Sequence, residues 1–406
     1  MRRMRAAWID IDLDAIVHNV EEVTNLVRRD RDKNTIPMPI IKGNAYGHGI
    51  YEVARVLYQE GITYFGVAIY EEALLVREAA PKGNVLILGY TPDDLAEDLI
   101  KHRITPTVYT FRQAAVLSQT AARLHAIAKV HVKLDTGMHR LGFPCTEESV
   151  DAIKAITQLP ALQVEGIFTH FATSHMKEKN YVFTQYNNYC TFLKKLQQRD
   201  IEIPLKHISN TGIILDNPEM NQDMVRFGSM VFGTFSSLDI HTERVSLKDT
   251  FALRAEIAYV KELAAGEGIG YDLAFVTKRQ SKIATLPLGY ADIGIRKLKN
   301  TGSVLLHGKR VPIVGGICMD QMMIDVTGID AKIGDTVTII GKDGDEQITL
   351  QEVAEHIGTD SYEVIISANQ RLPRRYWRKG CLYSELDENL VLAEYYAGKR
   401  TARTEL

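Results

Sequence analysis

Blocks of apolar and polar residues repeat along the first 230 or so residues of the chain. Short apolar runs, typical of buried strands, alternate with longer segments whose apolar residues recur at helical spacing. From Pro39 onward this predicts about eight strands, each followed by a helix, and such alternation implies a parallel sheet. Eight units over about 200 residues favour a closed (β/α)8 barrel of the TIM type. A doubly wound open sheet is the alternative, because periodicity does not show whether a sheet closes.

The pattern also sets approximate bounds for these elements. The predicted strands cover residues 38–42, 64–68, 85–89, 105–109, 130–134, 164–168, 205–208 and 224–227. The predicted helices cover residues 50–59, 71–80, 92–102, 111–124, 147–158 and 181–199, with a short one near Ile213. Before the repeat, residues 8–13 alternate apolar and acidic side chains as a half-buried strand does.

After about residue 245 short strands separated by glycine turns replace the helices. Examples of such turns are His307-Gly308-Lys309 and Lys342-Asp343-Gly344, and one helix is predicted at residues 350–357. This pattern predicts a mostly-β second domain. We therefore expect a barrel domain over residues 1–245 and a C-terminal β domain over residues 246–406. The first strand, near residues 8–13, is a candidate to pair with the C-terminal domain.

Composition narrows the class of protein. The 406 residues include 48 basic and 51 acidic side chains, a near-balance with a net charge of -3 that argues against a nucleic-acid-binding protein. No apolar run is long enough to predict a membrane span, and the basic start is too short for a signal peptide. The four cysteines are scattered, so neither a disulfide framework nor a metal site is expected, and a cytoplasmic location fits.

Residues 39–49 read Pro-Ile-Ile-Lys-Gly-Asn-Ala-Tyr-Gly-His-Gly. Lys42 follows an apolar run and precedes a turn with regularly spaced glycines. A lysine at the end of a buried strand loses hydration, which lowers its pKa and makes its amine a candidate nucleophile towards an aldehyde. The ordinary alternative is a strand whose terminal lysine reaches out to solvent.

Other polar groups follow predicted strands, at the end of a parallel barrel where reactive groups gather. They are Lys133, Arg140, His170, the turn 209–212 (Ser-Asn-Thr-Gly) and Arg226 with Gly228 and Ser229. Each has an ordinary explanation, such as a surface ion pair. Together they favour an anionic ligand that carries an aldehyde, with backbone amides at 211–212 and 228–229 as candidates to hold a phosphate. Pyridoxal phosphate fits this description.

Residues 41–49 resemble the cofactor-lysine signature of the alanine racemase family. Further segments match that family in its order along nearly the whole chain: 133–142, 169–171, 209–211, 225–228, 289–292, 318–321 and 371–374. The resemblance implies a pyridoxal-phosphate enzyme with an N-terminal barrel and a C-terminal β domain. It implies an isomerase that interconverts L- and D-alanine in the cytoplasm and provides D-alanine for the cell wall.

By this resemblance the enzyme uses two bases. Lys42 holds the cofactor as a Schiff base and serves one face of the substrate Cα, and Tyr271 serves the opposite face. His170 matches the residue that stabilises the phenolate of Tyr271. In the family the tyrosine belongs to the second subunit, which implies a homodimer with shared active sites and a small amino acid as substrate.

The resemblance assigns the remaining site residues. Arg226 faces the pyridine nitrogen, which then stays unprotonated because a guanidinium accepts no hydrogen bond. Arg140 lies near the cofactor phenolic oxygen and the substrate carboxylate, and Lys133, often carbamylated in the family, positions it. The phosphate-binding positions are Tyr46, Thr211, Gly228, Ser229 and Tyr362. The substrate-side positions are Tyr290, Met319 and Asp320, with the backbone amide of Met319 meeting the substrate carboxylate.

The chain departs from the family pattern at the substrate entrance. Gly315-Gly316-Ile317 lacks an arginine, and Asp272 is new next to the base. These changes shift the local charge by about two units towards negative, which favours a cationic substrate such as lysine or ornithine. A racemase of broader or basic specificity, serine included, is thus the alternative to alanine. A barrel decarboxylase is more remote, because Arg226 and Tyr271 match the racemase pattern.

Overall fold

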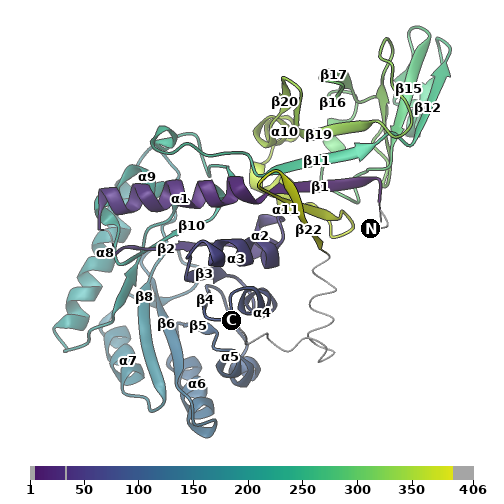
Figure 1. Ribbon diagram of the computed structural model, residues 1–406. Helices are drawn as coiled ribbons and strands as arrows, with labels where there is room; N and C mark the ends of the chain where they lie inside the picture. The colour runs from purple at the N-terminus through teal and green to yellow at the C-terminus, as the bar shows by residue number, and fades with distance from the viewer. Residues whose placement is uncertain (1–4, 33, 387–406) are drawn as a thin grey trace. The chain divides into compact units, whose positions relative to one another are not determined.

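The structure is a computed structural model that describes residues 5–32 and 34–386 (Figure 1). The chain divides into two compact units, and each unit is made of segments that are separate in the sequence. Among the described residues, the first unit combines residues 5–15, 46–49 and 249–386, and the second unit combines residues 16–32, 34–45 and 50–248. The short segment 46–49 thus belongs to the first unit, although the residues on both sides of it belong to the second.

Eight parallel strands of the second unit form a barrel. They are β2 (Ile36–Pro39), β3 (Tyr64–Val67), β4 (Asn84–Ile87), β5 (Thr105–Val108), β6 (Ala128–Asp135), β8 (Leu162–Phe168), β9 (Leu205–His207) and β10 (Met224–Phe227). Ladders join β3 through β9 in chain order, and β10 pairs with β2. Two contacts join these groups: a parallel bridge between Ile40 and Gly66, and a hydrogen bond from the Arg226 N–H to the Ser209 carbonyl at 3.2 Å. The ring is closed, so the barrel and not the open sheet is the correct prediction.

Helices follow the barrel strands as the pattern predicts. They are α3 (Ile50–Gln59), α4 (Tyr70–Ala79), α5 (Ala96–Lys101), α6 (Phe111–Arg123), α7 (Glu147–Thr157), α8 (Asn180–Gln197) and α9 (Thr211–Asp216). Three of these helices begin at a residue whose side chain accepts a hydrogen bond from a backbone amide of the first turn. Thr110 caps α6, Thr146 caps α7 and Asn210 caps α9. Inside the barrel, Met38, Ile40, Leu86 and Met224 form a buried apolar cluster.

The first barrel strand differs from the prediction. It covers Ile36–Pro39 rather than residues 38–42, and Lys42 begins a short turn, α2 (Lys42–Tyr46). Gly43, Asn44 and Ala45 have φ angles of 63°, 54° and 51°, so this turn is left-handed. The left-handed conformation costs roughly 1–2 kcal/mol for each non-glycine residue. Contacts with surrounding residues must therefore stabilise the turn.

The other unit is built on an eight-stranded sheet. Its order is β17 (Lys309–Pro312), β16 (Ser303–Leu306), β19 (Thr336–Asp343), β11 (Phe251–Glu256), β1 (Ala7–Asp12), β21 (Arg374–Arg378) and β22 (Cys381–Leu386), with β20 (Glu346–Ile348) paired to β19. Strand β1 lies inside this sheet, antiparallel to β11 and parallel to β21. Its alternating sequence suits a strand with one face buried.

Smaller elements complete this unit. A three-stranded sheet contains β12 (Tyr259–Leu263), β15 (Ser281–Leu286) and β18 (Met322–Asp325), and a hairpin pairs β13 (Gly268–Ile269) with β14 (Phe275–Val276). Two helices, α10 (Leu350–Ile357) and α11 (Ser361–Ile366), precede β21. The helix α1 (Leu13–Asp30) follows β1, and its residues from Ile16 onward belong to the unit that contains the barrel. Across the described residues of both units, no helix combines the length and apolar character needed to cross a membrane.

Candidate functional site

Lys42 lies in the left-handed turn after β2, and Glu72 on α4 holds that turn in place. One Glu72 carboxylate oxygen accepts the amides of Gly43 at 2.6 Å and Asn44 at 3.3 Å. The other accepts the amide of Ala68 at 2.9 Å. Asn44 in turn accepts the amide of Ile50 at 2.8 Å. A single carboxylate thus compensates for the strained backbone beside Lys42.

The environment of Lys42 corrects part of the sequence prediction. Its side chain is exposed in the isolated chain rather than buried at a strand end. Its pKa is nevertheless lowered, first by the protein atoms that displace water from one side of the amine and then by the Arg140 charge. Glu72 opposes this shift. Lys42 is therefore an accessible amine with a weakened hold on its proton.

Arg226, at the end of β10, is the most completely buried cation of the predicted set, with 3% of its surface exposed. Its guanidinium donates to the carbonyls of Thr169 at 2.7 Å and Ile208 at 3.1 Å. It also contacts Nδ1 of His207 at 2.8 Å and Nδ1 of His170 at 3.4 Å. Burial lowers its pKa to about 10, so the group remains charged at neutral pH.

A chain of hydrogen bonds runs from Arg226 through the barrel interior. Because arginine only donates, Nδ1 of His207 must accept, which leaves the His207 proton on Nε2. That nitrogen lies 2.9 Å from Nδ1 of His131 and donates to it. His131 then points its own Nε2 at the Glu165 carboxylate, 3.5 Å away. Burial lowers the pKa of both histidines, in keeping with two neutral rings of defined tautomer.

Glu165 is the outer end of this chain. It is 8% exposed, and its other oxygen pairs with Lys129 at 2.6 Å. All the donors in the series therefore point from Arg226 towards the Glu165 carboxylate. This arrangement fixes the orientation of the guanidinium with respect to the end of the barrel where Lys42 lies.

His170 follows β8 and is surrounded by cations. Burial lowers its pKa well below the usual value, and the charges of Arg226, Lys133, Arg140 and Lys42 lower it further, in that order. The structure thus brings together these five predicted residues, which come from the carboxyl ends of β2, β6, β8 and β10. Because Arg226 donates to Nδ1, neutral His170 carries its proton on Nε2 and is a hydrogen-bond donor there.

Lys133 in β6 is 4% exposed and lies over the ring of Phe168, with Nζ 4.5 Å from the ring centroid. Burial lowers the pKa of Lys133 to about 7, and the charges of Arg226 and Arg140 contribute to this shift. A neutral amine is therefore well populated near pH 7, as the reaction of a lysine with carbon dioxide requires.

The two predicted phosphate-binding turns lie side by side. The Arg226 amide donates to the Ser209 carbonyl. This bond holds the segment that leads to Gly228 and Ser229 next to the turn that contains Thr211. The Ser209 hydroxyl is fully buried, and it has no hydrogen-bond partner among the residues that the structure describes. A buried hydroxyl without a partner costs about 1–3 kcal/mol, so this turn is suited to a polar ligand.

Tyr46 and Tyr362, the other predicted phosphate-binding residues, belong to the unit that contains the large sheet. Burial raises the pKa of Tyr46 to about 12. Burial and the hydrogen bond that Tyr362 donates to Asp360, at 2.8 Å, raise the pKa of Tyr362 to about 12. Both phenols are therefore protonated donors at neutral pH, as phosphate binding requires.

The predicted second base and substrate-side residues lie in that same unit. Tyr271 begins the short turn between β13 and β14 and is 74% exposed. Met319 is 53% exposed, and Asp320 pairs with Arg371 at 2.6 Å. Tyr290 lies against Arg296, whose guanidinium carbon is 5.0 Å from the ring centroid. Tyr271 is thus presented on an exposed hairpin.

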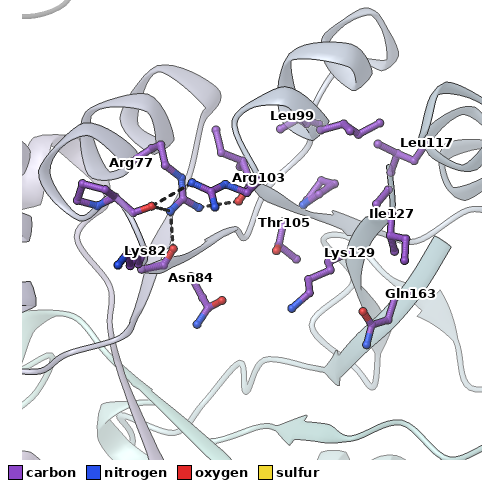
Figure 2. Close-up of a pocket in the computed structure, with 16 residues that line it drawn as sticks. Arg77, Lys82, Asn84, Leu99, Arg103, Thr105, Leu117, Ile127, Lys129 and Gln163 are labelled. Carbon is purple, nitrogen blue, oxygen red and sulfur yellow. Dashed lines mark hydrogen bonds between the residues drawn. The ribbon is translucent and has the colours of Figure 1, made fainter. Parts of the chain in front are cut away.

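A separate cavity of about 330 Å3 opens at the opposite ends of the barrel strands (Figure 2). Asn84, Thr105, Lys129 and Gln163 line it, close to the starts of β4, β5, β6 and β8. None of the predicted site residues contributes to this cavity. In barrels the chemistry gathers at the carboxyl ends of strands, so the cavity is not the candidate active site.

Four residues of the site network escaped the sequence prediction: Glu72, His131, Glu165 and His207. A sequence signal existed for His131, Glu165 and His207, since each stands inside a predicted strand, where a polar side chain that becomes buried needs a partner. Glu72 offered no signal, because a glutamate in the first turn of a helix is ordinary.

Comparison with known proteins shows the family to which the chain belongs. A family model described as "Alanine racemase, N-terminal domain" matches residues 11–236, and one described as "Alanine racemase, C-terminal domain" matches residues 250–376. The chain belongs to the alanine racemase family. It shares 41% identity with an alanine racemase of Methanococcus maripaludis, over 91% of this chain and 98% of that protein.

Solved structures of the family are also similar. An alanine racemase of Clostridium difficile 630 superposes with a TM-score of 0.89 at 37% identity, covering 95% of this chain and 99% of that one. A histidine racemase of Leuconostoc mesenteroides has a TM-score of 0.86 at 30% identity, covering 93% and 99%. The structures similar to this chain therefore include racemases named for two different amino acids.

Proposed function

We propose that the protein is a pyridoxal-phosphate-dependent racemase that interconverts L- and D-alanine by proton transfer on two faces of the substrate. The observation that carries this proposal is the gathering of Lys42, Lys133, Arg140, His170 and Arg226 at one end of the barrel, where Arg226 contacts His170 at 3.4 Å. The charges of the four basic residues lower the pKa of His170, in keeping with that arrangement. The match to alanine racemases over nearly the whole chain supports alanine as the substrate.

The residues fit the proposed cofactor. Lys42 offers an accessible amine of lowered pKa to an aldehyde. The unpartnered hydroxyl of Ser209 lies in the turn assigned to the phosphate. Arg226 presents a charged guanidinium that only donates, which suits an unprotonated ring nitrogen. The bound cofactor supplies electron withdrawal that acidifies the substrate Cα–H.

In the proposed reaction the protein supplies the proton transfers. Lys42 acts on one face of the Cα and Tyr271 on the other, and each removes or returns a proton according to the direction of racemisation. A phenol normally titrates near pH 10, so Tyr271 needs help to act as a base at neutral pH. The Nε2 proton of His170 supplies a hydrogen bond for that purpose.

We propose further that the enzyme works as a homodimer in which Tyr271 serves the site of the partner subunit. Tyr271 is 74% exposed, and Leu273 and Val276 on the same hairpin are 64% and 48% exposed. Apolar side chains exposed together on a turn are a common mark of a protein interface. A cytoplasmic location and a role in supplying D-alanine to the cell wall complete the proposal.

A racemisation assay with the cofactor spectrum recorded alongside tests the proposal. The enzyme is expected to convert each alanine enantiomer to the racemate, and Lys42→Ala is expected to abolish both turnover and the absorbance of the lysine-bound cofactor. Turnover of L-alanine by Lys42→Ala at the normal rate would refute the role of Lys42.

The same assay with L-serine, L-lysine and L-ornithine tests the alternative specificity. A basic preference is favoured by Asp272 and by Gly316, which stands where the family has an arginine and whose Cβ position is surrounded by open space. Faster turnover of lysine or ornithine than of alanine would replace alanine as the proposed substrate. The absence of any activity on basic amino acids would reject the alternative.

A further inference from the structure

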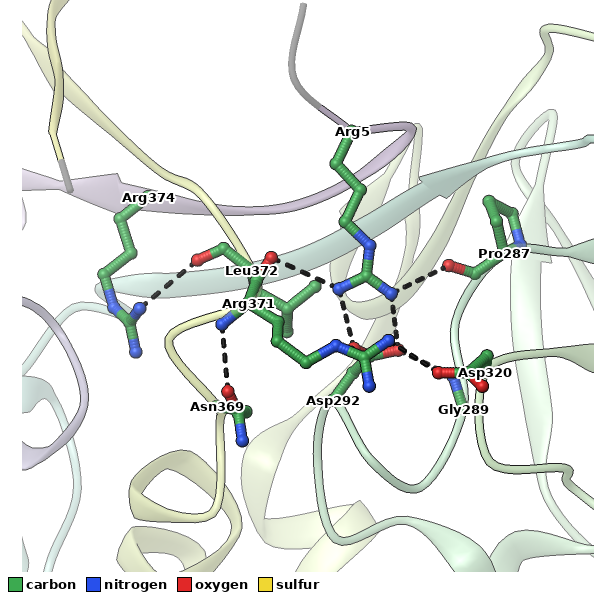
Figure 3. A network of polar contacts seen from close by, with 9 residues as sticks. All are labelled: Arg5, Pro287, Gly289, Asp292, Asp320, Asn369, Arg371, Leu372 and Arg374. Atoms are coloured by element: carbon green, nitrogen blue, oxygen red, sulfur yellow. Dashed lines mark hydrogen bonds and ion pairs between the residues drawn. The ribbon is translucent and has the colours of Figure 1, made fainter.

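An arginine near the start of the chain is bound inside the unit that carries the substrate-side residues. The guanidinium of Arg5 pairs in a bidentate manner with Asp292, at 2.6 Å to Oδ1 and 2.8 Å to Oδ2 (Figure 3). It also donates to the carbonyls of Arg371 at 3.2 Å and Pro287 at 3.3 Å. Asp292 is fully buried, so this pair is a strong and specific contact.

Asp292 in turn closes a tight loop. Its Oδ2 accepts the amide of Gly289 at 3.0 Å, and its own amide donates to the Gly289 carbonyl at 3.0 Å. Its carbonyl accepts the amide of Asn369 at 2.7 Å. The position and the charge of Asp292 therefore determine the conformation of residues 289–292, and Arg5 neutralises that charge.

This loop is packed directly on the segment that contains Met319. The amides of Tyr290 and Ala291 donate to the carbonyls of Cys318 at 3.1 Å and Met319 at 3.0 Å. A Cβ at Gly289 would lie 2.3 Å from those same two carbonyl oxygens, so no larger residue fits there. The backbone of residues 318–319 is thus held by the loop that Arg5 and Asp292 fix.

Arg371 also connects the 289–292 loop to the segment that contains Met319, because it pairs with both Asp292 and Asp320. Its Nε lies 3.4 Å from Asp292, and its Nη2 lies 2.6 Å from Asp320 (Figure 3). Asp292 therefore pairs with two arginines, of which only Arg5 makes the bidentate contact. Arg371 is 43% exposed at its side chain against 20% for Arg5, so Arg5 is the better-shielded partner.

From these contacts we infer that Arg5 is a positioning residue for the substrate-carboxylate site. It holds the 289–292 loop, and that loop sets the place of the Met319 backbone amide. The inference rests on the proposed function, in which that amide meets the substrate carboxylate. An interaction with the carboxylate is equal in the bound substrate and in the transition state, so its loss raises KM and leaves kcat nearly unchanged.

The test compares Arg5→Met, which keeps the length of the side chain, with Arg5→Lys, which keeps the charge but loses the bidentate geometry. Arg310→Met is the matched control, because Arg310 pairs with Glu346 and Glu352 in the same unit but contacts neither loop. Each holoenzyme is assayed for KM and kcat with L-alanine and for hydrogen exchange at the amides of Tyr290 and Ala291.

For Arg5→Met, exchange at these two amides is expected to accelerate on the order of 10-fold or more, and KM to rise on the order of 10- to 100-fold. The value of kcat is expected to change less than about threefold. Arg5→Lys should fall between Arg5→Met and the wild type, and Arg310→Met should match the wild type in both measurements. If Arg5→Met does not accumulate as folded protein, Arg5→Lys decides by the same criteria.

Unchanged exchange at Tyr290 and Ala291 would overturn the inference. So would a lower kcat at constant KM, because that result indicates loss of folded enzyme rather than a displaced carboxylate site. If the wild-type protein racemised no amino acid, the proposed function would fail, and the exchange measurement would still decide whether Arg5 holds the loop.

Discussion

His207→Phe removes the centre of the hydrogen-bond chain that runs from Arg226 to Glu165. Phenylalanine keeps the ring that stacks on Phe168, whose centroid is 4.7 Å away at an interplanar angle of 7°. It leaves an Arg226 N–H without its acceptor and His131 Nδ1 without its donor, both in a fully buried place. The perturbation removes two hydrogen bonds, and the ring carbons that replace the nitrogens at 2.8 and 2.9 Å add steric crowding to that loss.

The expected loss follows from those two contacts. A hydrogen bond to a charged group contributes about 1.5–3 kcal/mol and a neutral one about 0.5–1.5 kcal/mol, which gives roughly 2–5 kcal/mol in all. At about 2–4 °C per kcal/mol for a unit of this size, the Tm of the holoenzyme falls by roughly 4–20 °C. His207→Asn keeps an oxygen near the Nδ1 position and is expected to recover part of the loss.

Thermal unfolding of the holoenzyme, followed by circular dichroism at matched protein and cofactor concentrations, measures the effect. His241→Phe is the control, because the His241 side chain is 66% exposed and pairs with the similarly exposed Glu243; its Tm is expected to stay within about 2 °C. A Tm for His207→Phe equal to the wild-type value would refute the assigned tautomers and the hydrogen-bond chain.

Three further predictions concern the site. The pKa of Lys133 is lowered to about 7, so its neutral amine increases from pH 6 to pH 8; a carbamate signal from 13C-bicarbonate in NMR should increase with it and be absent in Lys133→Met. Gly316→Arg should fold, because its Cβ position is open, and should lower the ratio of kcat/KM for L-lysine to that for L-alanine several-fold; an unchanged ratio would refute the charge argument. Glu72→Ala leaves three amides without their acceptor and should weaken cofactor retention on gel filtration by about 5- to 100-fold, whereas Glu72→Gln should retain most of it.

The barrel was predictable because strand and helix periods alternate regularly and leave few other architectures. Closure was not predictable, since it depends on long-range contacts such as the bridge between Ile40 and Gly66. The left-handed turn after β2 was missed for a similar reason. Only Gly43 suggests it locally, and the contacts that hold it come mainly from Glu72, which accepts the amides of Gly43 and Asn44.

Much of the candidate site could be named from the sequence, because polar residues that follow buried strands in a barrel gather at one end. The family resemblance added Tyr271 and Met319, which no local pattern singles out. The hydrogen-bond chain through His207 and His131 required the registers of β6 against β8 and of β8 against β9, which sequence periodicity does not provide.

The central claim is that Lys42 and Tyr271 act as two bases in one site made by two subunits. Mixing Lys42→Ala and Tyr271→Phe subunits after separate purification, with conditions that allow exchange, tests it most directly. Each variant alone is expected to be nearly inactive in racemisation. Random pairing makes half of the dimers mixed, and each mixed dimer has one site with both bases, so activity should recover to about a quarter of the wild-type value.

Continued inactivity of a mixture shown to contain mixed dimers would contradict a shared site, because it would place Lys42 and Tyr271 of the same subunit together. Full activity of either variant alone would contradict the two-base mechanism itself.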